Sequence, residues 1–218
     1  MTSRSRFFTW TLASVLIGAG AETARAQKGE AGVSGGGSFF TTQTVTAARG
    51  TGEVGFENGF SVGGWIGHNL YRHLSGEIHY NYERNDLKLS SGGTKVTFAG
   101  QAHAVHYDVL IYGTPTGSRV RPYGLVGVGA KQYRGTGTEA AFQPLSTLAI
   151  LTKTKELQWL ATFGGGVKVG LGGSLFLRLE FRDYMTRFPQ VVIAPVPGAA
   201  IGGWIHNLVG QAGVGFTF

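Results

Sequence analysis

Apolar and polar residues alternate along three segments in the last third of the chain. Between Ser174 and Tyr184, one face carries Leu175, Leu177, Leu179 and Phe181, and the other carries Arg178, Glu180 and Arg182. Successive side chains of a β-strand point to opposite faces, so this pattern predicts a strand with one apolar and one charged face. The same alternation recurs over Glu156–Val169 and Asn207–Phe218.

Five further segments of similar length continue the pattern upstream: Glu30–Phe39, Gly59–His68, Gly76–Asn85, Val96–Tyr112 and Pro122–Tyr133. In the fourth strand of the resulting eight, Val105, Tyr107, Val109 and Ile111 are expected to face lipid, and His106 and Asp108 the interior. The first half of this strand breaks the phase, which predicts a bulge or an extension beyond the membrane. The fifth is rich in glycine and alanine, which leaves its facing open.

The predicted connections alternate between short and long. The short ones are 69–74, 113–120 and 170–173, and the long ones are 41–58, 86–95, 135–153 and 186–203. This alternation predicts short periplasmic turns, long extracellular loops and both termini in the periplasm. Aromatic residues near the strand ends are expected to form two interfacial girdles: Trp159, Trp204, Tyr133 and Tyr184 outside, and Tyr71, Tyr112, Tyr123 and Phe218 inside.

Composition supports a membrane barrel. The chain has 37 glycines, 26 aromatic residues and only 14% charged residues, and no segment after the amino-terminal region reads as a long apolar helix. Backbone polar groups in lipid must be paired within the protein, which leaves a closed barrel when helices are lacking. The predicted fold is therefore all-β, an eight-stranded antiparallel up-and-down transmembrane barrel.

The amino terminus has the features of a secretory signal peptide. Arg4 and Arg6 precede an apolar stretch of about 15 residues, shorter than the roughly 20 that a spanning helix needs. Ala24 and Ala26 supply the small residues that a signal peptidase reads. We therefore predict a signal peptide over residues 1–26, a mature start at Gln27 and a barrel domain over residues 27–218.

Charge and cysteine content exclude other classes of protein. Cleavage after Ala26 removes three arginines and one glutamate, so the net charge falls from +7 to +5. The remaining cations are scattered, which gives no support for nucleic-acid binding. The chain has no cysteine, so it contains neither a disulfide framework nor a lipoprotein anchor.

The eight-segment layout, the Arg121-Pro122-Tyr123 start of a glycine-rich strand and the ending Gly213-Val214-Gly215-Phe216-Thr217-Phe218 resemble the OmpA/OmpX-like outer-membrane β-barrel family. The resemblance covers the whole predicted mature chain and implies a location in the bacterial outer membrane. It also implies that Val214, Phe216 and Phe218 form the assembly signal. Outer-membrane lipid, the barrel-assembly machinery and periplasmic chaperones are the implied partners. We expect no peptidoglycan-binding domain like that of full OmpA proteins after Phe218, so its anchoring role is not carried over.

The interior of an eight-stranded barrel is just wide enough to be filled by side chains. The residues expected there form a lumenal charge network of Glu30, Glu77, His79, Asp108, Lys168, Arg178, Glu180 and Arg182, with Glu83 and Lys131 as further candidates. Buried charges need partners, and Arg178 and Arg182 are expected to reach carboxylates such as Glu30, Glu77 or Glu180. A salt-bridged plug is the favoured interpretation, and a narrow gated solute path is the alternative.

Candidate catalytic and metal-binding motifs are weak. His73-Leu74-Ser75 resembles the His-x-Ser pair of a lipid A deacylase class, but it falls in a predicted periplasmic turn, away from the outer leaflet. His103 and His106 are three apart in an extended segment and so face opposite sides. We expect neither catalysis nor a metal or other cofactor.

Two long loops are unusually apolar, over residues 140–151 and 188–204. Apolar patches on a surface often mark binding sites, whereas strand extensions that pack on one another above the membrane would produce the same pattern. Two functional classes remain. The first is a structural, envelope-integrity or surface-interaction barrel whose long loops would contact any extracellular ligand, and the second is a small channel.

Overall fold

The computed structural model describes residues 29–218. The predicted signal peptide, Ala24, Ala26 and the predicted start at Gln27 lie outside these residues. Eight long strands form the barrel: β1 Gly29–Phe40, β4 Gly59–Tyr71, β5 Leu74–Arg84, β8 Gly100–Tyr112, β9 Val120–Gly135, β11 Lys155–Gly172, β12 Leu175–Arg187 and β15 Trp204–Thr217. Seven short strands lie beyond one end of it: β2 Gln43–Ala47, β3 Gly50–Phe56, β6 Leu87–Ser91, β7 Thr94–Phe98, β10 Ala149–Leu151, β13 Ile193–Pro195 and β14 Ala200–Ile201.

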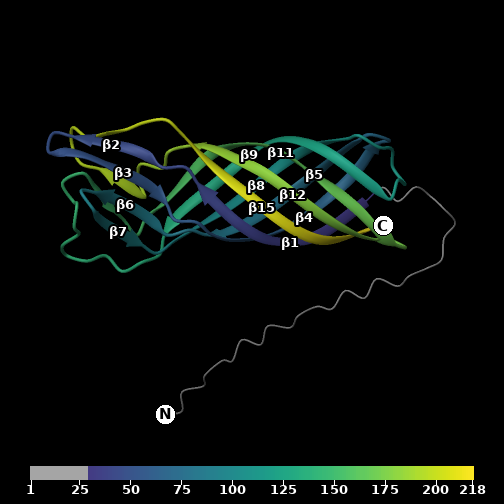
Figure 1. Cartoon of the computed structure of the whole chain (residues 1–218), viewed down its shortest axis with the longest axis horizontal. Helices are drawn as coiled ribbons and strands as arrows, with labels where there is room; N and C mark the ends of the chain where they lie inside the picture. Colours follow the sequence, from purple (N-terminus) through teal and green to yellow (C-terminus); the bar gives the residue numbers. More distant parts are fainter. Residues whose placement is uncertain (1–28) are drawn as a thin grey trace, which may run out of the picture.

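The long strands close into a barrel in the order β1-β15-β12-β11-β9-β8-β5-β4, with every neighbouring pair antiparallel (Figure 1). The first and last strands pair from Glu30↔Thr217 to Phe40↔Asn207, which completes the wall. The predicted eight-stranded antiparallel barrel is confirmed. The described residues contain no helix long and apolar enough to cross a membrane.

Short turns connect the strands at the end where the carboxyl terminus lies (Figure 1). The turn between β11 and β12 uses Gly172 and Gly173, whose φ angles of 121° and 58° are rarely adopted by residues with a side chain. The long connections all lie at the opposite end, as predicted.

The alternation of the strands directs apolar side chains outward. Ile78, Val105, Phe163 and Leu179 are exposed on the outer wall, while Glu77, Asp108 and Lys168 are buried inside. On β8 the alternation is regular from Gly100 onward, with the predicted facing. The facing of β9, which the sequence left open, places Val126 and Val128 outward and Leu125 and Lys131 inward.

The prediction of two aromatic girdles was half wrong. Trp159, Trp204, Tyr71 and Phe218 are exposed on the outer surface, whereas Tyr112, Tyr123, Tyr133 and Tyr184 are buried within the barrel. Each buried tyrosine lies an even number of positions from an inward charged residue on the same strand, as Tyr184 does from Arg182 and Tyr133 from Lys131. It therefore faces the same side. The period of two therefore overrides the preference of tyrosine for interfaces.

The long connections fold into a compact unit, here called the cap, which comprises residues 41–58, 85–99, 136–154 and 188–203. A five-stranded sheet in the order β14-β2-β3-β6-β7 and a two-stranded sheet of β10 and β13 build it. The predicted single strand Val96–Tyr112 is wrong, because β7 and β8 are separate. β7 pairs with β6 in the cap, and the barrel wall begins at Gly100.

The cap has a hydrophobic core of its own. Its apolar side chains pack onto the uppermost inward residues of the barrel, and its core comprises Val45, Val54, Phe56, Leu87, Leu89, Phe98, Leu148, Ala149, Leu151, Phe188, Val192, Ile193 and Ile201. The two apolar loops thus pack on one another within this core, through Leu148 and Leu151 of the first and Val192 and Ile193 of the second. Phe142, Ile150 and Val191 remain exposed.

Candidate functional site in the barrel lumen

The lumen contains the charged residues of the barrel strands. All eight members of the predicted network have their side chains inside, with exposures of 7% or less, and Glu83 and Lys131 lie there as well. Their placement follows from parity, because each stands an even number of residues from another inward position on its own strand. Six of the eight form one connected group, and Glu30 and Lys168 form a separate pair.

Arg178 on β12 is the centre of the group. Its two terminal nitrogens each donate to one oxygen of Glu77 on β5 at 2.7 Å, which is a bidentate pair across the lumen. Its Nε donates to Oη of Tyr123 at 2.8 Å, and it also contacts Glu180 on its own strand. The guanidinium lies 4.5 Å from the ring centroid of Trp65. Arg178 thus joins three sides of the barrel.

Arg182, four residues further along β12, shares Glu180 with Arg178 and binds further acceptors of its own. Its Nη1 donates to Asp108 on β8 at 2.8 Å, and its Nε donates to Glu180 at 2.7 Å. Nη2 lies 3.2 Å from Nδ1 of His79. Glu180 therefore stands between the two arginines and accepts from both, as the predicted pairing of inward charges requires.

Two further ion pairs close the lumen on either side of this group. Toward the cap, Lys131 donates to both oxygens of Glu83, at 2.9 and 2.8 Å, and Asn207 donates to Glu83 at 2.6 Å. Toward the short turns, Lys168 pairs with Glu30. The lumen is consequently filled at three levels, and none of the expected arginine contacts reaches Glu30.

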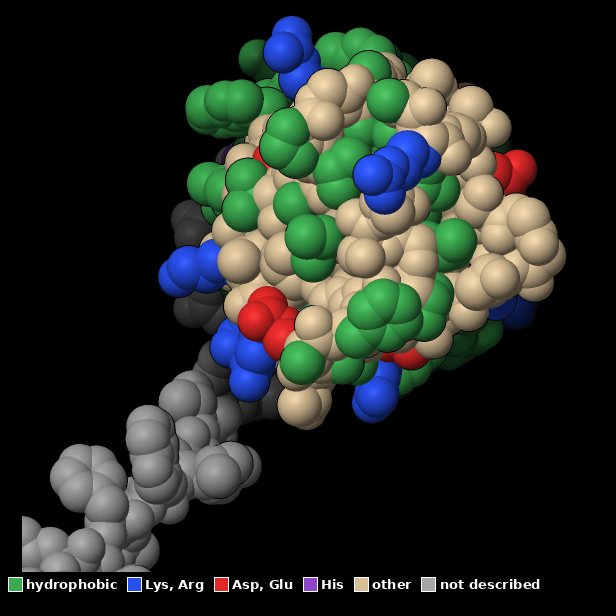
Figure 2. Space-filling view, turned by 90° about the vertical axis from the view of Figure 1, so that its left-hand side faces the viewer, with side chains coloured by type: hydrophobic (Ala, Val, Ile, Leu, Met, Phe, Trp, Pro, Cys, Tyr) green, Lys and Arg blue, Asp and Glu red, His purple; other side chains and the backbone are tan. Residues whose placement is uncertain are grey.

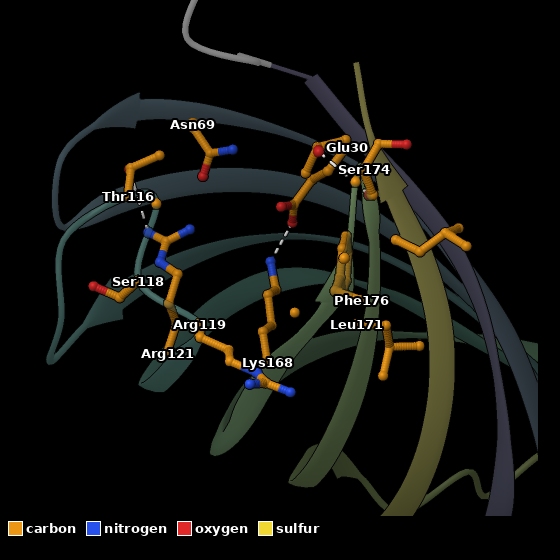
Figure 3. A pocket seen from close by; sticks show the side chains of 16 residues that line it. Glu30, Asn69, Thr116, Ser118, Arg119, Arg121, Lys168, Leu171, Ser174 and Phe176 are labelled. Atoms are coloured by element: carbon orange, nitrogen blue, oxygen red, sulfur yellow. Dashed lines mark hydrogen bonds and ion pairs between the residues drawn. The ribbon is translucent and has the colours of Figure 1, made fainter.

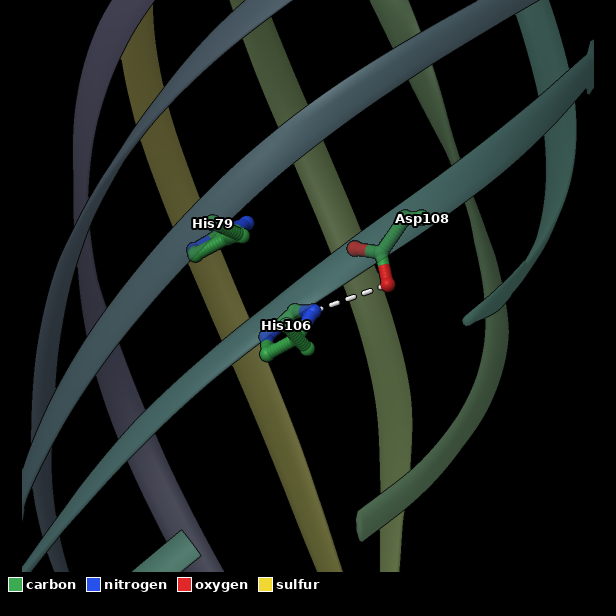
Figure 4. A group of neighbouring side chains, drawn as sticks. All are labelled: His79, His106 and Asp108. Atoms are coloured by element: carbon green, nitrogen blue, oxygen red, sulfur yellow. Dashed lines mark hydrogen bonds and ion pairs between the residues drawn. The ribbon is translucent and has the colours of Figure 1, made fainter. Parts of the chain in front are cut away.

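Three lumenal residues, His79, His106 and Asp108, have possible ligand atoms within 4.8 Å of one another (Figure 4). Nδ1 of His106 lies 2.8 Å from Asp108, and Nη1 of Arg182 approaches the other ring nitrogen of His106 at 3.3 Å. The Arg182 guanidinium therefore supplies the positive charge at this position. The group does not fit a metal ion, which would have to displace that charge.

The other histidine motifs are also separated in space. Nδ1 of His73 lies 2.9 Å from the carbonyl oxygen of Tyr112, while Oγ of Ser75 donates to Asn69 at 2.7 Å. His73 and Ser75 thus have different partners. His103 lies on the outer side, where its ring contacts Tyr80 at 2.8 Å, and His106 lies inside.

A cavity of about 750 Å³ opens at the end of the barrel where the short turns lie (Figure 3). Its walls include the Glu30–Lys168 pair, Arg121 on β9 and polar side chains of the turns. Sequence reasoning did not include Arg121 among the inward charges, although its parity with Lys131 on the same strand places it there.

The residues of the predicted assembly signal lie on the outer wall. Val214 and Phe216 on β15 are 52% and 46% exposed, and Phe218 follows that strand with 61% exposure. Phe216 and Phe218 are in ring contact, with centroids 5.6 Å apart. Their role in assembly remains a prediction.

Comparison with protein families finds a match over residues 11–218 to the family described as outer membrane protein beta-barrel domain. A comparison with curated proteins finds no significant match. Among solved structures, the chain is similar to OprG from Pseudomonas aeruginosa, with 12% identity, a TM-score of 0.61 and coverage of 88% of this chain and 97% of that one.

Two further solved structures have the same fold. The outer membrane protein AlkL, determined in DMPC bilayers, is 14% identical with a TM-score of 0.56 over 93% of this chain and 96% of that one. Neisserial surface protein A is 12% identical with a TM-score of 0.53 over 86% and 97%. At these identities, the similarity concerns the fold alone.

Proposed function

We propose that this chain, which belongs to the outer membrane protein beta-barrel domain family and is located in the bacterial outer membrane, is a closed barrel that holds a folded cap at the cell surface. In this proposal its role is structural, in envelope integrity, or depends on contacts of the cap. The observation that carries the proposal is the bidentate Arg178–Glu77 pair across the middle of the lumen. Two more levels of ion pairs and the core of the cap support it.

Conduction tests the closed state. Wild-type protein in planar bilayers should give little or no steady current, whereas the double variant Arg178→Ala/Glu77→Ala removes the central pair and should open more often. The matched control is Arg187→Ala, which changes an outward arginine on the same strand. A large, steady wild-type conductance that does not respond to changes at Arg178 would reject the closed barrel.

The second candidate function, a narrow channel, is favoured by the cavity of about 750 Å³ at the turn end. It extends inward as far as the Glu30–Lys168 pair, which would act as a gate. Steady conductance that increases in Lys168→Ala would support this function over the first.

The surface of the cap is the part available for extracellular contacts. Figure 2 looks onto this end and shows apolar side chains separated by polar atoms and backbone, with basic side chains both within the face and near its edge and acidic ones near the edge. Phe142 and Val191 are 76% and 50% exposed and lie outside the cap core. These two residues are the proposed contact positions.

A deletion strain distinguishes an integrity role from a contact role. Loss of the protein should increase sensitivity to a large hydrophilic antibiotic, and the wild-type gene should reverse the effect. Reversal by the Phe142→Ser/Val191→Ser variant as well would assign the role to the barrel, whereas reversal by wild type alone would assign it to the cap. Unchanged sensitivity of the deletion strain would reject the integrity role.

Outer-membrane lipid is proposed to contact the outer surface of the barrel. The barrel-assembly machinery and periplasmic chaperones are the proposed partners before the barrel is inserted. Three outward cations, Arg84, Arg134 and Lys155, lie at the cap end of their strands, and Arg134 is directly opposite Lys155. Outward cations at this height would lie beside the phosphate groups of the lipids, just above the apolar band of the barrel. Brominated lipids should quench the fluorescence of outward Trp159 and leave lumenal Trp65 unaffected. Equal quenching of both would contradict this placement.

A further inference from the structure

The turn end of the lumen contains a row of three cations. Arg121 on β9 is directly opposite Lys168 on β11, and Lys168 is directly opposite Arg178 on β12. All three side chains point inward and are buried, Arg121 with 8% exposure. Like charges directly opposite on neighbouring strands repel each other, so such a row requires anions nearby.

Two of the three cations have carboxylate partners within the protein. Lys168 pairs with Glu30, and Arg178 pairs with Glu77 and Glu180. Arg121 makes no ion pair with any residue of the described part of the chain. Among the described residues, its side chain makes one hydrogen bond, a long one of 3.5 Å from Nη2 to Oγ1 of Thr116, and its Nε is buried without a partner there.

Packing positions the Arg121 guanidinium without neutralising it. Its central carbon lies 3.7 Å from the ring centroid of Tyr112, a cation–π contact that fixes the plane of the group. Burial of a charge without a counter-ion is unfavourable, and the ring compensates for only part of that cost. The head group is therefore held in place with donors unused.

Arg121 lines the open cavity of about 750 Å³ (Figure 3). Side chains of Asn69, Thr116, Ser118 and Ser174 also line this cavity and bring several hydrogen-bonding groups near the mouth. A guanidinium binds the oxygens of a phosphate or carboxylate through two parallel hydrogen bonds. The additional hydroxyl and amide groups suit an anion with more than two oxygens.

We propose that the mouth of the barrel binds an oxyanion of the phosphate class, with Arg121 as its anchor. The anion would complete the row by giving its third cation a counter-ion. Phosphate oxygens could come from a free phosphate in the periplasm or from an inner-leaflet lipid headgroup that reaches over the rim, where Leu171 and Leu175 are exposed. The proposal is independent of the function assigned to the cap.

The Nε–H resonance of Arg121 reports directly on the site. Nitrogen-labelled protein purified in a maltoside detergent, which has no phosphate, is titrated with inorganic phosphate, and chloride at equal ionic strength serves as the reference. The Arg121 resonance should shift and saturate with phosphate in the millimolar range, as expected for one or two charged hydrogen bonds with a small ion. Chloride should leave it in place.

Variants test whether phosphate binds at Arg121, and a second experiment in lipid nanodiscs tests whether the phosphate belongs to a lipid headgroup. Arg121→Gln and Arg121→Lys should each weaken phosphate binding, measured by calorimetry, by about tenfold or more. Arg72→Gln, an exposed arginine in a neighbouring turn, should not weaken it. In phosphatidylglycerol nanodiscs without free phosphate, a shifted Arg121 resonance would indicate the lipid headgroup as the source, and an unshifted one would indicate free phosphate.

Absence of a shift in both arms, or an equal shift with chloride, would overturn the proposal. Phosphate affinity that is unchanged in folded Arg121→Gln would also overturn it. Heat-dependent gel mobility verifies that the variants are folded. The wild-type titrations decide the question even if a variant does not fold.

Discussion

The lumen and the cap are two cores of opposite chemistry built by one chain. The lumen contains five carboxylates in ion pairs, those of Glu30, Glu77, Glu83, Asp108 and Glu180. The outer wall around it carries apolar side chains such as Ile78 and Leu179. The cap buries Val54, Leu87 and Ile193 and exposes polar groups. The change occurs around Tyr133 and Tyr184, which are fully buried at the upper end of the barrel strands.

The difference shows that the surroundings determine which side chains each core contains. Lipid supplies no partner for a charge, so in the barrel the charges are inside, where each can find another. Water above the membrane favours burial of apolar groups, so the cap follows the rule for soluble proteins. The two cores should consequently respond differently to the same kind of substitution.

The largest effect is expected for Arg178→Ala. This change removes both hydrogen bonds of the bidentate pair from Glu77, which keeps only the more distant contacts with Arg182 at 3.7 Å and His79 at 3.6 Å, and it removes one of the two arginine partners of Glu180. The free energy of unfolding should therefore decrease by about 3–5 kcal/mol. Denaturant titration of the barrel in lipid vesicles, followed by gel mobility, measures it. Arg187→Ala on the outer face of the same strand is the control and should change it by less than about 1 kcal/mol. Equal effects of the two variants would contradict a structural role of the lumenal pair.

A cavity in the cap should have a smaller and local effect. Leu89→Ala removes a side chain that is 1% exposed, and the cap should lose about 3 kcal/mol of stability. Hydrogen exchange of the β3 and β6 amides should accelerate while barrel amides and gel mobility stay unchanged. Ile150→Ala, at a 43% exposed position of the cap, serves as the control. Simultaneous loosening of the barrel would show that the two cores are not separate.

The lipid-facing wall should reject a charge that the surface of the cap accepts. Phe216→Asp places a carboxylate against lipid at a cost of about 2 kcal/mol, less if the position lies near the interface, and should lower the yield of folded barrel. Deletion of Phe218 should also lower the yield of folded barrel. Phe142→Asp in the cap should leave the yield unchanged. The heat-dependent gel shift of outer-membrane fractions compares them, and equal yields for all variants would remove the basis for an assembly signal in this strand.

The smallest effect is expected for an ion pair on the cap. Nζ of Lys95 lies 2.8 Å from Glu57, and the lysine side chain is 51% exposed. Because water and salt screen such a pair, Lys95→Ala should cost less than about 1 kcal/mol. Hydrogen exchange in β6 and β7 provides the measurement. A loss comparable to that of Arg178→Ala would mean that exposure does not distinguish ion pairs in this molecule.

Much of the barrel could be predicted because a strand has a period of two. Once Leu177 and Leu179 face lipid, Arg178 and Glu180 must face the lumen, and no knowledge of partners is needed. The same rule applied throughout would have placed Arg121, Tyr123 and Tyr184 inside as well. Treating the tyrosines as interfacial gave residue type more weight than position.

The cap could not be predicted in the same way. Its strands are short, from two to seven residues, and glycine-rich turns interrupt them, so no alternation is long enough to fix a facing. The pairing of β14 with β2 joins residues near 200 to residues near 46, and sequence spacing contains no information about such a contact. The specific partner of each lumenal charge is also set by strand order and stagger. Glu30 therefore binds Lys168 rather than an arginine.

The pairing of β1 with β15 also has a consequence for the time course of folding. Glu30 faces Thr217 across this seam, and Arg178 and Glu77 are 101 positions apart in the chain. Bringing such distant positions together closes a long loop of chain and lowers its conformational entropy before the contact adds any stabilisation. Folding that depends on these contacts is therefore slow. The ion pairs that cross the lumen, such as Arg178–Glu77 and Lys168–Glu30, join strands that are not neighbours in the barrel, so they cannot form within an isolated hairpin. An incomplete wall would therefore have unpaired ions on its inner face and unpaired strand edges at its ends. Completion of the seam should therefore be cooperative, with the charge pairs forming late and together.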